Sequence, residues 1–304
     1  MANILLRSPH YIPLDRAGAS YATLELTVNG LLRYTITNNL DASDNVLFEI
    51  SELCRDYLDV VYDGTYNSFA ADISATVTFY NTSDVEVGDP ETIPHKGFDG
   101  YGDFLDGHNP VVNPDTIMQS NIIVYVPEGA TGVIPYESSG AIAYATFGSS
   151  SPSLSVAGTI VTIRRICEAK YTPIKVTFVN KFGALQDIYL YKKQTKSMSI
   201  QREMYKSNII STTGTYQTYN HNKRNLKSVG AERITANTGF LCNNMNEPMK
   251  QLMLSEQVWA TIDNNVIPIN ITNSDFTYKT SVNDKLINYT MEFEYAFDAI
   301  NNIR

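Results

Sequence analysis

The sequence predicts a mainly β fold of antiparallel, β-sandwich-like domains, with one or two short helices, long loops and an extended arm. Hydrophobic residues make up 43% of the 304 residues and charged residues 18%, below the roughly 25% of an average globular protein. Tyrosine, with 20 copies, is abundant and favours strands. Segments in which polar and apolar residues alternate recur along the chain, bounded by turn residues. These features together indicate β-structure with weakly charged surfaces.

The chain is longer than the roughly 100–200 residues of a typical single domain, so we expect either two domains or one large β domain with an insertion. The order of strands and loops divides it into three ranges. Residues 1–90 are expected to form an N-terminal β-sandwich-like domain. Residues 91–168 hold a long Gly/Asp loop and further strands that complete the N-terminal region. Residues 169–304 are expected to form a C-terminal β-rich domain with a polar arm at about 207–233.

The clearest local pattern is a β-hairpin in the segment TLELTVNGLLRYTIT. Apolar residues alternate with polar ones up to Val28 and again from Leu32, and Asn29-Gly30 supplies the two positive-φ positions of a type I′ turn. In the next segment, FEISELCRDYLDV, Ser51 is expected to cap a short helix. The alternating segment ADISATVTFY then predicts a strand. Its inward face carries Ile73, Ala75, Val77 and Phe79.

The middle of the chain combines an irregular stretch with strands. Between Pro90 and Pro114 the periodicity disappears, and glycine, aspartate and proline predict a long loop instead of a core element. Strands resume in NIIVYVPE and AGTIVTIRRICEA, which are rich in β-branched residues. The small residues of 136–155, between these strands, predict a surface loop or an irregular edge.

The C-terminal part begins with two strands in YTPIKVTFVNKFGALQDIYLY and a third in SMSIQREMYKS. Residues 207–233 are polar and predict an extended arm or a long loop. A short helix is expected in NNMNEPMKQLMLSEQVW, capped by Asn246 with Pro248 in its first turn. In KLINYTMEFEYAFDAI every second residue from Ile287 to Phe297 is apolar, which predicts a strand with one buried face.

Charge is unevenly distributed along the chain. Residues 169–233 hold twelve Lys and Arg against three Asp and Glu, a local charge of +9, which leaves −18 on the rest of a chain whose net charge is −9. A solvated basic surface accounts for this most simply. A basic surface of one copy that meets an acidic surface of a neighbour is a second interpretation. Nucleic-acid binding is a third, although no known binding module is visible.

The sequence carries no motif of a known catalytic mechanism, and we expect no catalytic residue, no cofactor and no bound metal. The cysteines lack the spacing of a zinc site or a disulfide scaffold, so they are expected to be buried or inert: Cys54, Cys167 and Cys242. The histidines lie in turn-like segments and are expected to be surface or hydrogen-bonding residues: His10, His95, His108 and His221. The segment MANILLRSPHYIPL has too short an apolar run for secretion or membrane spanning, so we expect synthesis in a cytoplasm and no membrane partner.

The loop HKGFDGYGDFLDGHNP, residues 95–110, is the one segment that resembles a site. Its aspartates Asp99, Asp103 and Asp106 do not match the ligand spacing of an EF-hand. Another calcium site, a transition-metal site with His95 and His108, or a glycosidase carboxylate pair stay open from the sequence alone. The structural interpretation is that glycines permit tight turns while three rings anchor the loop: Phe98, Tyr101 and Phe104.

The same loop carries a resemblance to a known family. Its signature residues are Gly100, Tyr101, Gly102, Phe104, Asp106, Gly107, Asn109 and Pro110. This loop, followed by Met-Gln-Ser-Asn at 118–121, resembles virion structural proteins of tailed bacteriophages that infect Bacteroidota. Further similarity lies in the turn with Asn180, Gly183 and Ala184 and in the segments LSEQVW, VIPINIT and NDKLINYTMEFEYA, which resemble tail and baseplate components.

The resemblance implies a non-enzymatic subunit of the virion, in a tail ring, adaptor or baseplate, that assembles into a symmetric homo-oligomer. The implied location is the virion, in its tail, after synthesis in the host cytoplasm. The implied partners are copies of itself and other virion proteins, with no membrane, nucleic acid or small-molecule ligand. The alternative is a receptor- or glycan-binding tip or a capsid decoration protein, and a glycan depolymerase is a third hypothesis.

Overall fold

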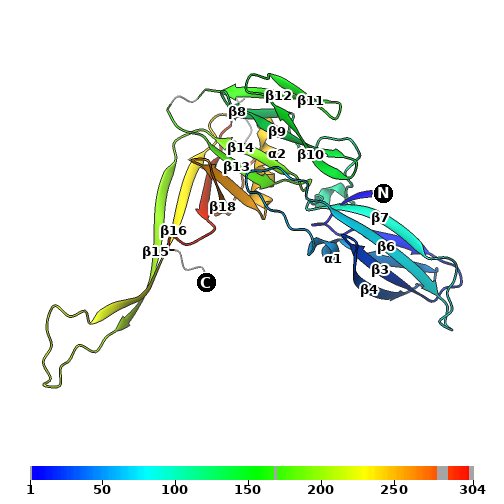
Figure 1. Cartoon of the computed structure of the whole chain (residues 1–304), viewed down its shortest axis with the longest axis horizontal. Helices are drawn as coiled ribbons and strands as arrows, with labels where there is room; N and C mark the ends of the chain where they lie inside the picture. Colours follow the sequence, from blue (N-terminus) through cyan, green and yellow to red (C-terminus); the bar gives the residue numbers. More distant parts are fainter. Residues whose placement is uncertain (1, 168–169, 279–286, 301–304) are drawn as a thin grey trace.

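The computed structural model describes residues 2–167, 170–278 and 287–300. Within these residues the chain is mainly β with two short α-helices, which confirms the predicted fold class. Figure 1 shows an elongated molecule: an N-terminal sheet lies at one end, a group of sheets lies in the middle, and a two-stranded ribbon projects at the other end. Residues 168–169 and 285–286, which belong to two predicted strands, lie outside the described residues.

The N-terminal sheet has five strands among the described residues, in the order β1-β7-β6-β3-β4. β1 and β7 are parallel, whereas the other neighbours are antiparallel. A separate antiparallel pair, β2 with β5, packs apolar side chains against the core of this sheet, which gives a small sandwich. The strands are β1 (Ala2–Leu5), β2 (Tyr11–Asp15), β3 (Tyr21–Val28), β4 (Leu31–Asn39), β5 (Asn45–Glu49), β6 (Ala71–Tyr80) and β7 (Glu91–Phe98).

The predicted hairpin is confirmed in β3 and β4, and the strand predicted after it is β6. Asn29 and Gly30 have φ of 53° and 76°, the left-handed values that a type I′ turn requires. The four predicted inward residues of β6 are buried, and Val77 lies opposite Leu24 of β3. Burial of each such aliphatic side chain contributes roughly 1.5–3 kcal/mol, so this face forms the core of the N-terminal sandwich.

Two N-terminal predictions are wrong. Residues 91–98, predicted as part of a loop, form β7 between β1 and β6, because backbone pairing on both edges compensates for a sequence with little apolar alternation. Ser51 does not cap the helix α1 (Ser51–Arg55) but is its first residue. The backbone N–H of Ser51 donates to the Glu49 carboxylate at 2.9 Å, so Glu49 takes the role that we assigned to the Ser51 hydroxyl.

Two small sheets in the middle of the molecule pack around a core that includes Val126, Ile134 and Phe147. Parallel β8 and β12 with antiparallel β11 form one sheet, and the hairpin of β9 and β10 forms the other. The strands are β8 (Ile123–Pro127), β9 (Gly132–Ser138), β10 (Ala141–Phe147), β11 (Ser153–Val156) and β12 (Thr159–Ile166). The prediction of a loop or irregular edge at 136–155 is therefore wrong, because its alanine, glycine and serine residues conceal the alternation.

The C-terminal sheet has seven strands among the described residues, in the order β14-β13-β17-β18-β19-β16-β15. The strands are β13 (Ile174–Val179), β14 (Leu185–Leu190), β15 (Thr195–Lys206), β16 (Lys223–Asn237), β17 (Val258–Ile262), β18 (Asn265–Ile271) and β19 (Thr290–Tyr295). The three predicted strands after residue 170 are confirmed in β13, β14 and β15. The predicted arm is only partly a loop, because its residues from Lys223 onward form β16, which pairs with β15.

Helix α2 (Asn246–Leu254), preceded by the 3-10 turn η2 (Asn243–Met245), packs Met249 and Leu252 into the core of this sheet. The predicted helix is confirmed, but the Asn246 cap is wrong. Asn246 lies inside the first turn, and its side-chain oxygen accepts a hydrogen bond from the Tyr289 hydroxyl. The predicted C-terminal strand is confirmed, and its buried face extends from Ile287 to Phe293, whereas Phe297 is 49% exposed.

His95 is neither a surface nor a loop residue, contrary to the prediction. It lies buried on β7, its ring contacts that of His10 with centroids 5.1 Å apart, and neither ring nitrogen has a hydrogen-bond partner among the described residues. Burial, with a smaller contribution from His10, lowers the pKa of His95 to about 4. The folded state therefore favours the neutral ring.

We predict that the free energy of unfolding decreases as the pH falls from about 6.5 to about 4, because the unfolded chain binds a proton at His95 that the folded chain excludes. His95→Phe should reduce this slope in urea unfolding measured across that range. His221→Gln, at an exposed position, serves as the control and should keep it. An unchanged slope in His95→Phe would contradict the assignment.

Candidate functional site: the junction loop and the ribbon arm

Residues 99–110, here called the junction loop, lie where the N-terminal sheet meets the C-terminal sheet. The backbone of Gly100 touches the turn between β13 and β14 so closely that a Cβ there would lie 2.4 Å from the Lys181 carbonyl oxygen. On the other side of the contact, a Cβ on Gly183 would lie 2.7 Å from the Asp99 nitrogen. The Tyr101 N–H donates to the Lys181 carbonyl at 2.8 Å. Glycine at 100 and 183 is therefore required by backbone-to-backbone packing.

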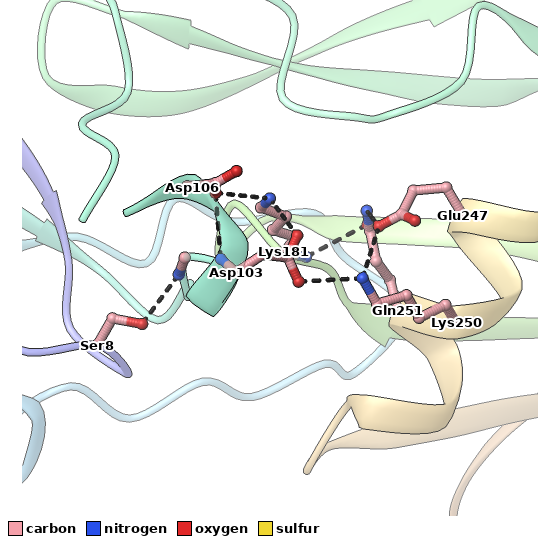
Figure 2. A network of polar contacts seen from close by, with 8 residues as sticks. Ser8, Asp103, Asp106, Lys181, Glu247, Lys250 and Gln251 are labelled. Atoms are coloured by element: carbon pink, nitrogen blue, oxygen red, sulfur yellow. Dashed lines mark hydrogen bonds and ion pairs between the residues drawn. The ribbon is translucent and has the colours of Figure 1, made fainter. Parts of the chain in front are cut away.

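Asp103 is the centre of a polar network that links the junction loop to the C-terminal sheet and to α2 (Figure 2). Its two carboxylate oxygens contact different lysines: Oδ2 lies 2.7 Å from Nζ of Lys181, and Oδ1 lies 3.0 Å from Nζ of Lys250. Hydrogen bonds from Lys181 and then Lys250 lower the pKa of Asp103. Gln251 extends the network, since its side-chain Oε1 accepts a hydrogen bond from the backbone N–H of Lys181 at 3.3 Å. One carboxylate thus joins three segments that are far apart in the sequence.

A second group of ion pairs joins the same two parts of the chain. Arg7 pairs with Glu256 at 3.1 Å and donates to the Leu254 carbonyl at 3.1 Å. Arg55, at the end of α1, pairs with both Asp99 at 3.0 Å and Glu256. Each arginine therefore connects the N-terminal sandwich with the segment that follows α2.

Buried amides complete the junction. The side-chain nitrogen of Asn180 donates to the Met118 carbonyl at 2.7 Å and to Oε1 of Gln186 at 3.0 Å. Gln186 in turn donates to Oδ1 of Asn121 at 2.9 Å. Four of the segments that carry the family resemblance, 100–110, 118–121, 180–184 and 254–259, thus converge on one place. They position the two parts of the molecule relative to one another.

The structure separates the predicted signature residues into three groups. Gly100, Tyr101, Gly102 and Pro110 lie at the base of the loop, where the Gly102 N–H donates to the Ser8 hydroxyl at 2.9 Å. Asp106 and Gly107 end the 3-10 turn η1 (Phe104–Asp106), in which Asp103 and Asp106 form a capping box. Asn109 lies beside the base, half-buried.

Phe104 does not anchor the loop, and that part of the prediction is wrong. It is 99% exposed, and the neighbouring Leu105 is 94% exposed. Phe98 is fully buried as predicted, whereas Tyr101 is half-buried with Arg7 over its ring at 5.1 Å. Polar contacts hold the tip of η1 away from the core, so its apolar side chains point to solvent.

The junction carboxylates are arranged as ion-pair partners. Asp99 and Asp103 face cations on different sides of the loop, and His108 is exposed with Nδ1 2.8 Å from the Asp106 carbonyl oxygen. Among the described residues no group of three or more His, Cys, Asp and Glu is placed to hold a metal ion. Within the same residues, no helix is long and apolar enough to cross a bilayer.

The cysteines lie apart from the junction carboxylates. Cys54 is buried, and burial raises the pKa of its thiol to about 12, in line with an inert residue. Cys242 accepts a hydrogen bond from the Tyr125 hydroxyl at 2.6 Å. Cys167 is exposed, so of the predicted alternatives, buried or inert, burial does not hold for it.

The second candidate site is the ribbon arm, defined as residues 201–229, which projects from the body in Figure 1. β16 pairs with β19 only from Arg233 onward, so among the described residues the strands of the ribbon arm pair only with one another. The paired part of the ribbon arm, residues 201–206 with 223–229, would span roughly 20 Å. None of its residues is buried. Six large apolar side chains are exposed on it: Met204, Tyr205, Ile210, Tyr216, Tyr219 and Leu226.

The ribbon arm is strongly basic. It carries five Lys and Arg against one acidic residue, Glu203. Lys206 lies directly opposite Lys223, and Arg224 follows in the same strand. Like charges directly opposite one another destabilise a strand pair. The cations at this end of the free ribbon therefore repel one another, and an anionic partner would reduce that repulsion.

A scan against protein-family models finds no match for this chain, and a search of curated proteins finds none either. The comparisons therefore neither support nor oppose the family resemblance, which stays a prediction. Sequence reasoning located the junction loop but missed its partners Arg7, Arg55, Lys181 and Lys250. No spacing rule connects cations to carboxylates that lie so far away in the chain.

We predict that Asp103→Asn lowers the free energy of unfolding by about 1 kcal/mol, because it removes two partly exposed ion pairs while keeping the side-chain shape. Asp59→Asn is the control: Asp59 is exposed and forms no side-chain hydrogen bond or ion pair with another described residue. Urea unfolding of the two variants measures the difference. Equal effects of both substitutions would show that the network does not stabilise the junction.

Proposed function

We propose that this protein is a structural subunit of a tailed-bacteriophage particle, in a tail ring, adaptor or baseplate, and that it assembles into a symmetric oligomer. The resemblance of the junction segments suggests the class of particle. The observation that carries the proposal is the ribbon arm, which has no buried residue and ends in an unfavourable cluster of cations. Such a ribbon gains little stability within one copy, so its natural role is to contact a neighbour.

The junction supports the same proposal in a different way. A subunit that docks at both ends must keep those ends in a fixed relation, and the ion pairs of Arg7, Arg55 and Asp103 fix the N-terminal sandwich against the C-terminal sheet. The described carboxylates of the junction form ion pairs with Lys and Arg side chains. Nothing in their arrangement favours the depolymerase hypothesis.

The binding-tip alternative draws support from one observation. Tyr216 and Tyr219 are 63% and 77% exposed in the loop at the end of the ribbon arm. Exposed aromatic rings stack on the apolar faces of sugars, so this loop could recognise a glycan. The two functions differ in whether the ribbon arm contacts another virion protein or a receptor.

We predict that replacing residues 204–226 with Asn-Gly leaves a folded chain that no longer enters particles. Glu203 and Lys227 lie opposite each other, so a two-residue turn can join them without disturbing the sheet. Circular dichroism checks the fold, and mass spectrometry of purified particles, assembled with the shortened chain as the sole copy, measures incorporation. Incorporation at the normal level would contradict the proposal.

The matched variant keeps the ribbon arm at full length and changes only Tyr216→Ser and Tyr219→Ser. The structural function predicts normal particles that attach to host cells as before. Particles of normal composition that fail to attach would instead support the receptor- or glycan-binding alternative.

A further inference from the structure

The end of the N-terminal sandwich farthest from the junction is acidic. Tyr21 pairs with both Asn39 and Tyr80, so the turns that follow β4 and β6 lie at the same end of the sheet. The backbone bond from the Arg16 N–H to the Asp44 carbonyl, 3.1 Å, brings the turn after β2 to that end as well. We call the turns 15–20, 40–45 and 81–91 the acidic tip. Its exposed carboxylates include Asp15, Asp41, Asp44, Asp84, Glu86 and Asp89.

Few cations offset this charge. Arg16 is the one Lys or Arg in these three turns, and it pairs with Glu91 at 3.7 Å. The hydrogen bonds that the Asp41 carboxylate accepts from the backbone N–H groups of Asn45 and Ser43 lower its pKa. The acidic tip therefore carries an uncompensated negative charge at neutral pH.

The acidic tip also offers an apolar surface. A shallow groove between the β2–β5 pair and the end of β4 is lined by Leu14, Leu40 and Leu47 together with Asp15 and Asp41. Leu47 is 51% exposed, and Val85 on the neighbouring turn is 57% exposed. Apolar side chains beside carboxylates are the complement of the ribbon arm, in which apolar side chains stand beside cations.

The two surfaces cannot meet within one copy. Figure 1 shows the ribbon of β15 and β16 at one end of the molecule and the turn between β6 and β7 at the other, with the junction between them. The ion pairs of the junction hold this separation. A contact between them must therefore join two molecules.

We propose that the ribbon arm of one copy docks on the acidic tip of the next copy. The inference rests on the proposed function, because it names the partner of the ribbon arm within the assembly. Lys206, Lys223 and Arg224 face the carboxylates of the neighbouring tip, and the exposed apolar side chains of the ribbon arm cover the Leu14–Leu40–Leu47 groove. A contact between two different surfaces repeats from copy to copy and closes into a ring when the rotation permits.

The test is a reciprocal exchange of charge. The arm variant carries Lys206→Glu, Lys223→Glu and Arg224→Glu; the tip variant carries Asp15→Lys, Glu86→Lys and Asp89→Lys. These positions are exposed, so circular dichroism and the melting temperature should match the unmodified chain. Sedimentation velocity of the purified full chain at low and high salt measures self-association.

The unmodified chain is expected to associate at low salt and to weaken on the order of tenfold or more at 0.5 M salt, because exposed charges are screened. Each variant alone is expected to lose association, because the arm variant carries negative charge on both surfaces, and the three substitutions of the tip variant bring the net charge of its tip from −6 to zero. An equimolar mixture of the two is expected to recover association as heterodimers, because the basic arm of the tip variant meets the acidic tip of the arm variant.

The inference is overturned if the unmodified chain stays monomeric at low salt, if either variant associates as the unmodified chain does, or if the mixture fails to recover association. These results separate it from the proposed function. Failure of the charge exchange, with loss of incorporation on shortening the ribbon arm, would leave a virion role through another contact. If the charge exchange restores association but the protein is absent from particles, the contact between copies stands and the virion role is contradicted.

Discussion

The close backbone contact between the junction loop and the β13–β14 turn is the constraint on which the rest of the structure depends. Gly100 and Gly183 allow two main chains to touch where any Cβ would overlap the opposite backbone. Around this contact Asp103, Arg7 and Arg55 add ion pairs from both sides. Apart from the buried carboxylate of Asp99, the partners are partly exposed and such pairs are individually weak, so the number and the convergence of the pairs fix the two sheets.

Because the junction fixes the two sheets relative to one another, the basic and the acidic segments of the sequence are held at separate places in the molecule. The basic segment becomes a ribbon that leaves the body at one end, and the acidic turns gather at the opposite end (Figure 1). Charges of opposite sign so far apart do not neutralise one another within a copy, because their separation exceeds the roughly 10 Å over which 0.1 M salt screens them. They remain available to a neighbour, and they favour one orientation of approach over the others.

The sequence predicted those elements that its local pattern specifies. The Asn29-Gly30 turn, the alternation of β6 and that of β19 led to correct strands, because a distinct turn specifies the hairpin and one buried face specifies each of the other two strands. β7, β9, β10 and β11 were missed, since their pairing partners and not their own alternation determine them. The arm was recognised by its polarity, but the pairing of β15 with β16 could not be read from polarity alone.

The sequence predicted a structural role for the junction loop, and the detail of the loop differs from that prediction. Phe104 resembled an anchor because aromatic residues are usually buried, and its exposure follows from the polar contacts that hold η1 at the surface. Asp103 resembled a turn residue, and it does form a capping box, but its contacts with Lys181 and Lys250 join distant segments. Such long-range pairs are invisible without the fold.

Disulfide cross-linking between chains that each carry one exposed cysteine tests the docking of the ribbon arm most directly. In a Cys167→Ser background, one chain carries Tyr219→Cys at the end of the ribbon arm and another carries Asp89→Cys at the acidic tip. We expect a disulfide between the two chains when they are mixed at low salt, and none within a single chain that carries both substitutions. Absence of the intermolecular product, or a disulfide within one chain, would contradict the docking.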